Sequence, residues 1–132
     1  MKLEIKPMDV AKVIEFLKEL NIKGLAGIHR SKVANFLTKK LEELIEGEKT
    51  IQKDFADDKE KLAEEMKLFL DEDIVISGDE FAKPLHSLKA QIKKIVLEEE
   101  LEFNGEKADT LLFLYEAFEL DLDNKENEKE ND

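Results

Sequence analysis

The chain has 132 residues, of which 41% are charged, with a formal net charge of −12 and no cysteine. This length suffices for one domain with its own apolar core, and the lack of cysteine excludes disulfides, thiolate metal sites and a cysteine nucleophile. No apolar run approaches the roughly 18 residues of a membrane span, and the first twenty residues carry acids, unlike a signal peptide. We therefore expect a cytoplasmic protein with no membrane segment.

The charge is unevenly distributed along the chain. Residues 1–53 contain 11 Lys and Arg against 8 Asp and Glu, a net +3, whereas residues 54–132 contain 10 against 25, a net −15. A chain this acidic is repelled as a whole by nucleic acid and by anionic lipid. Nucleic acid is therefore not an expected partner.

The first twenty residues predict a strand followed by a helix. Residues 1–6 alternate, with Leu3 and Ile5 on one side, as a half-buried strand does. Pro7 suits the first turn of the helix, and Asn21 and Gly24 are expected to end it. The helix is predicted by apolar residues at helical spacing, namely Val10, Val13, Ile14, Leu17 and Leu20.

The stretch from Lys32 to Phe55 predicts one long helix around which the rest is organised. Its apolar residues recur at steps of three and four: Val33, Phe36, Leu37, Leu41, Leu44, Ile45, Ile51 and Phe55. Residues 25–28 are expected to connect into it, and its start stays open, because Ser31 could cap it or Ala26 could already lie inside. Gly47 is expected to weaken it, with a kink or break there as one outcome. Because Glu48 interrupts the apolar stripe, we expect packing within the domain up to Leu44 and an opening toward solvent or a second subunit beyond.

The rest of the chain alternates helices with short extended segments. Residues 62–70 predict a third helix, Ile74–Ile76 a strand, residues 81–95 a fourth helix with Pro84 in its first turn, and residues 101–103 another strand. A fifth helix is expected from about Lys107 to Leu120. Residues 121–132 carry too little apolar surface to offset the entropy of ordering, and we expect a disordered acidic tail.

These elements predict an α+β fold, mostly α, with about five helices around one long central helix and a small sheet of short strands. The whole forms a single helical domain over residues 1–120, followed by the tail. Three short strands need one another and a covering helix to be stable. The alternative is an all-α bundle in which the three triplets are extended connectors.

Residues 21–41 contain no acid and supply the one candidate interaction patch, made of Lys23, Arg30, Lys32, Lys39 and Lys40. Positive charge near the beginning of a helix opposes the helix dipole and calls for an explanation. Two explanations stay open: the charges balance the acidic half of the chain, or they form a docking face for an anionic partner. Within the second explanation, nucleic acid is the less favoured anionic partner, because the patch has no interleaved aromatic residues.

No motif for catalysis or cofactor binding is present. There is no phosphate loop, dinucleotide fingerprint, HExxH or nucleophile elbow, and the acidic runs 71–73 and 98–100 lack the spacing of a calcium loop. His29 and His86 are isolated in sequence. We predict no enzyme, no catalytic residue, no cofactor and no metal.

Several segments resemble a family of uncharacterised small acidic, mostly helical proteins encoded by phages and prophages of Gram-positive bacteria. The similarity lies in Arg30-Ser31-Lys32, Phe36-Leu37, Leu41-Glu42-Glu43 and residues 51–58, and in the layout of the opening LEIKPMDVAKVIEFLKELNIKG and the closing GEKADTLLFLYEAFE. The resemblance implies a phage accessory protein and carries over no functional residue.

Together these observations predict a non-enzymatic interaction protein with an unidentified protein partner, in which a homo-oligomer is an open alternative. The second hypothesis is an acidic decoy or inhibitor that occupies a nucleic-acid-binding host protein by imitating nucleic-acid charge. A continuous negative face would favour the decoy, and interleaved signs the interaction protein.

Overall fold

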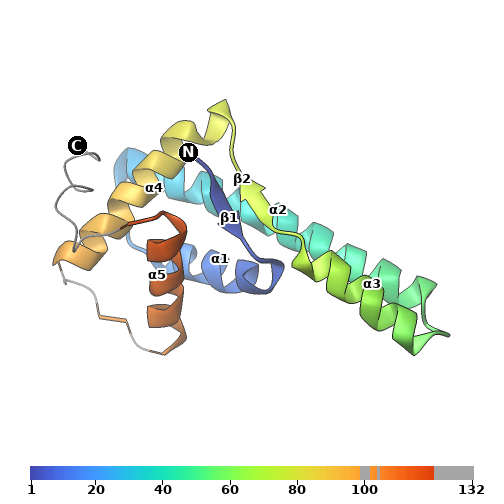
Figure 1. The fold of residues 1–132 in the computed structure, drawn as a ribbon. Coiled ribbons are helices and arrows are strands. Elements are labelled where there is room, and N and C mark those ends of the chain that lie inside the picture. The colour runs from blue at the N-terminus through green and yellow to red at the C-terminus, as the bar shows by residue number, and fades with distance from the viewer. Residues whose placement is uncertain (99–101, 104, 121–132) are drawn as a thin grey trace.

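The computed structural model describes residues 1–98, 102, 103 and 105–120, and the tail predicted at 121–132 lies outside them. Within this range the chain forms five α-helices and a two-stranded sheet, which confirms the α+β, mostly α class over the all-α alternative (Figure 1). In order, the elements are β1 (Leu3–Ile5), a 3-10 turn (Pro7–Asp9), α1 (Val10–Glu19), α2 (Gly24–Asp54), α3 (Lys59–Asp71), β2 (Ile74–Ile76), α4 (Asp79–Glu98) and α5 (Glu106–Ala117).

The two strands pair antiparallel, with Leu3 opposite Ile76 and Ile5 opposite Ile74. These four side chains are buried, whereas the central pair, Glu4 and Val75, faces solvent, as alternation along a strand requires.

The third predicted strand, at residues 101–103, is not found where the chain is described. Leu101 lies outside the described residues, and Glu102 and Phe103 belong to no strand. The ring of Phe103 packs instead on that of Phe16, with 5.3 Å between ring centroids. Burial of one aromatic side chain against α1 takes the place of sheet pairing.

The core lies between the sheet, α1, the first half of α2, α4 and α5. Most of its residues lie on the predicted apolar stripes, but Phe16, Ala34, Leu114 and Leu120 do not, and α5 buries Leu114 while Leu112 is exposed. The buried apolar residues are Leu3, Ile5, Val10, Val13, Ile14, Phe16, Leu17, Leu20, Val33, Ala34, Leu37, Ile74, Ile76, Phe81, Leu85, Leu88, Ile92, Leu114, Phe118 and Leu120.

Two ion pairs join distant parts of the chain at the surface of this body. Lys6 binds Asp73 at 3.2 Å beside the sheet, and Lys107 on α5 binds Glu19 on α1. The Glu19 carboxylate accepts a hydrogen bond from Lys107 and attracts its charge, which raises the pKa of that lysine. Both pairs are exposed, so they orient elements more than they stabilise them.

The long helix begins at Gly24, which agrees with the earlier of the two starts that the sequence left open. Residues 25–28, expected to be a connector, form the first turns of α2, and Gly24, expected to end the previous helix, is its first residue. The chain leaves α1 through an extended Leu20 instead. Gly27 permits this close turn, because a side chain at that position would collide with the backbone carbonyl of Ile22.

The long helix also continues through Gly47, so the break that the sequence allowed there does not occur. A Cβ at Gly47 would collide with the ring of Phe69 on α3, and glycine is therefore the residue that lets the two helices approach. The second half of α2 and α3 form an antiparallel hairpin that projects from the body (Figure 1). The apolar stripe beyond Leu44 faces α3 rather than opening directly to solvent or a second subunit.

We expect Leu37→Ala to lower the free energy of unfolding by about 2–5 kcal/mol, because Leu37 is fully buried and its truncation leaves a cavity. Leu41→Ala, one turn further along, should cost less, because Leu41 is only partly buried at the margin of the core. Urea denaturation of both variants measures the difference. An equal or larger cost at Leu41 would contradict this placement of the core boundary.

Candidate interaction surface

Arg30, from the predicted basic patch, binds the end of α1. Its Nη1 atom donates to the carbonyl oxygens of Leu17 at 2.7 Å and Leu20 at 3.2 Å, with a longer contact to Lys18 at 3.3 Å. The last carbonyls of a helix have no partner within it, and positive charge there is favoured by the helix dipole. The positive charge of Arg30, which is unfavourable near the beginning of α2, therefore stabilises the end of α1.

Lys32 supplies a hydrogen bond that Pro84 removes from α4. The sequence placed Pro84 in the first turn, but it lies inside the helix, five residues after Asp79. Because proline has no N–H, the carbonyl of Glu80 loses its normal partner four residues on. Lys32 Nζ donates to that carbonyl at 2.9 Å and lies 5.3 Å from the ring centroid of Phe81.

The remaining members of the patch differ from one another. Lys40 pairs with Glu43 on the next turn at 3.3 Å and lies 5.6 Å from the ring centroid of Phe36. Lys23 and Lys39 are exposed and make no hydrogen bond or ion pair with the described part of the chain. Only one of the five therefore pairs with an acid there, and Arg30 and Lys32 bind backbone carbonyls.

One face of the first half of α2 is exposed throughout. Leu25, Ile28, Lys32, Asn35 and Lys39 follow one another at steps of three and four, and all are exposed. Leu25 and Ile28 are 67% and 65% exposed, which is high for large apolar side chains in a regular helix. We call these five residues the basic stripe.

The second half of α2 and α3 form the arm, residues 42–73, whose shared seam is incompletely covered. α3, all of which is described, has no buried residue, and its apolar side chains facing α2 are only partly buried. Ile45 and Leu68 are exposed on the outer faces. The arm is thus held by one layer of half-covered apolar contacts around Gly47 and Phe69.

The arm carries much of the acidity of the protein. Residues 42–73 include 13 Asp and Glu and 5 Lys, a net charge of −8. Glu65 lies in the middle of α3, and Asp58 and Glu72, seven residues before and after it, are the N-cap and C-cap residues at the two ends of this helix. We call these three residues the acidic edge. The outer faces alternate in sign instead, with Lys49 and Lys53 beside Glu42 and Glu46.

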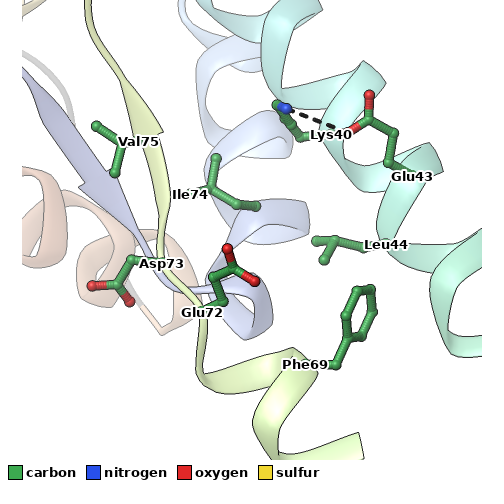
Figure 2. Close-up of a pocket in the computed structure, with 8 residues that line it drawn as sticks. All are labelled: Lys40, Glu43, Leu44, Phe69, Glu72, Asp73, Ile74 and Val75. Atoms are coloured by element: carbon green, nitrogen blue, oxygen red, sulfur yellow. Dashed lines mark hydrogen bonds and ion pairs between the residues drawn. The ribbon is translucent and has the colours of Figure 1, made fainter. Parts of the chain in front are cut away.

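A groove of about 230 Å³ lies at the root of the arm, where α2, the end of α3 and β2 meet. Figure 2 shows Leu44, Phe69 and Ile74 facing one another across it, with the Glu72 carboxylate between the strand and α2. Lys40 and Glu43, paired with each other, form the upper rim. The groove therefore offers apolar walls next to one end of the acidic edge.

The described residues contain no group of three or more His, Asp or Glu side chains placed to hold a metal ion. Nor does any helix among them have the length and apolarity needed to cross a membrane. Comparison of the chain with models of protein families, with curated proteins and with solved structures gave no match.

Sequence reasoning missed the arm and its groove, although two signals were present. One was the seven-residue spacing of Asp58, Glu65 and Glu72. The other was Gly47 opposite an aromatic residue in the next helix, which indicates close helix packing as readily as a break.

We expect Arg30→Met to lower the free energy of unfolding by about 1.5–3 kcal/mol, because a charged donor to several helix-end carbonyls is lost. Lys39→Met is the matched control, and its effect should stay within about ±0.5 kcal/mol. Thermal or urea denaturation compares them. Equal effects would mean that Arg30 contributes no more than an exposed lysine.

A double-mutant cycle tests the link between Lys32 and Pro84. Lys32→Met should cost more in the wild type than in a Pro84→Ala background, where the alanine N–H can bond to the Glu80 carbonyl. We expect a coupling of about 0.5–1 kcal/mol from urea denaturation of the four proteins. Identical costs in both backgrounds would show that the proline and the lysine act independently.

Proposed function

We propose that this chain is a non-enzymatic interaction protein whose contact element is the arm. The observation that supports this is the arm itself, a helical hairpin that projects from the body with no buried residue on its second helix, as far as the chain is described. Such an element adds little to the core, since the buried residues of α2 all precede it. Partly covered apolar side chains on a projecting element are typical of binding surfaces.

The biological setting follows from the sequence resemblance alone: an accessory protein of a phage or prophage, acting in the cytoplasm of the host cell. Signs of charge are interleaved on the outer faces of the arm, where Lys49, Lys53 and Lys67 lie among acids. By the criterion of surface charge, this favours the interaction protein. The net negative charge of the whole arm favours a partner whose surface is predominantly basic.

A second candidate is the acidic decoy, an inhibitor of a nucleic-acid-binding host protein. The observation that favours it is the net −8 of residues 42–73, which includes the acidic edge. The two candidates differ in whether nucleic acid competes with this chain for the partner. Duplex DNA should displace the partner of a decoy, and it should leave the partner of an ordinary interaction protein in place.

Site-specific photo-crosslinking tests the proposal. A photoreactive amino acid is placed at Ile45 or Leu68 on the arm, and at Met8 or Leu112 as equally apolar, exposed positions on the body. We expect arm positions, in cells that carry the phage genes, to give adducts whose mass is not a multiple of the chain's own. Adducts from the body positions alone would contradict an arm-based function, and loss of the arm adducts on addition of duplex DNA would favour the decoy.

A further inference from the structure

We propose that the arm also binds a second copy of this chain, with the basic stripe of one molecule lying along the acidic edge and groove of another. This inference rests on the proposed function only in that the arm is the contact element. Two unexplained features motivate it: large apolar side chains exposed on the first turns of α2, and a groove whose apolar walls adjoin Glu72, an acid for which the fold shows no partner within the described chain.

The spacing of charges on the two surfaces agrees. Lys32 and Lys39 are seven residues apart on α2, a rise of about 10.5 Å along the helix. On α3 of the second copy, Asp58 and Glu65 have the same separation. When the helices run antiparallel, Lys39 lies opposite Asp58 and Lys32 opposite Glu65.

The same register brings the apolar residues to the groove. Four residues further along each helix, Ile28 lies opposite Phe69, and Leu25 lies beyond the last residue of α3, beside Glu72. Glu72 and Phe69 both line the groove, together with Leu44 and Ile74. A space of about 230 Å³ accommodates an aliphatic side chain, so the register that pairs the charges also brings Ile28 to the apolar walls of the groove, with Leu25 at its edge.

The symmetry of this contact follows from its two different surfaces. The basic stripe belongs to the first half of α2 and the acidic edge to α3, so a molecule bound through one surface keeps the other free. Contacts of this kind are heterologous and add subunits head to tail. Exposed ion pairs supply orientation and the apolar residues supply most of the affinity.

Sedimentation velocity of the full chain over a range of concentrations tests the proposal. We expect the average mass to rise above the 15.3 kDa of one chain as concentration increases. Leu25→Ser with Ile28→Ser should weaken association about tenfold without affecting the fold, because both side chains are exposed. Leu68→Ser, an equally exposed leucine of α3 outside the acidic edge, is the matched control and should change nothing.

Charge reversal tests the register. Lys32→Glu with Lys39→Glu, and separately Glu65→Lys, should each abolish association at moderate salt; Asp58 is left unchanged because it caps α3. An equimolar mixture of the two variants should associate again, because each retains the surface that the other has lost. Circular dichroism confirms that each variant is folded, which is needed because Lys32 also binds the Glu80 carbonyl.

A wild-type chain that stays monomeric up to about 1 mM, the weakest affinity that a few exposed contacts give, would overturn the proposal. So would a mixture of the charge-reversed variants that fails to associate. Neither result affects the proposed function, because arm adducts with a different protein in the crosslinking experiment would persist in a monomeric chain. Conversely, self-association with no such adducts would leave this inference standing and remove the other.

Discussion

The length of α2 is the constraint from which the rest of the structure follows. Its 31 residues span about 46 Å at 1.5 Å per residue, whereas a small domain is about 30 Å across. Its buried residues, as far as the structure describes them, are Gly27, Val33, Ala34 and Leu37, all in the first half. Because α2 extends beyond the body, the apolar side chains of its second half must be covered by another element, and α3 covers them.

The hairpin made in this way is anchored unequally at its two ends. At its root, α3 passes within three residues into β2, whose Ile74 and Ile76 are buried against β1, and Asp73 pairs with Lys6. At its tip, residues 52–61 are exposed apart from a partly buried Phe55, and Asp58 caps α3 by accepting a hydrogen bond from the Lys61 N–H. Since local stability follows buried contacts, opening should begin at the tip while the groove at the root keeps its shape.

Periodicity predicted the five helices and the two paired strands, because apolar spacing reports which side of an element is buried, but it also predicted a strand at residues 101–103 that is not found where the chain is described. It predicted boundaries less well. The start of α2 depends on Gly27 packing against a backbone carbonyl, and the absence of a break depends on Phe69 covering Gly47. Both are contacts between segments, which a single segment's pattern does not contain.

The basic patch shows the same limit for side-chain roles. The excess of positive charge in residues 21–41 was evident in the sequence, and charge balance against acids was a reasonable explanation. Yet Arg30 and Lys32 bind carbonyls at the end of α1 and beside Pro84, and a backbone acceptor leaves no trace in amino-acid identity. The contacts of Arg30 and Lys32 explain two of the five residues in the patch. Lys39, with Leu25 and Ile28 on the same face, has no such role within the described chain, and neither do Glu65 and Glu72 of the acidic edge. Exposed charges contribute little to stability. The separation of the basic stripe, on the first half of α2, from the acidic arm therefore matters most for how a binding partner is oriented.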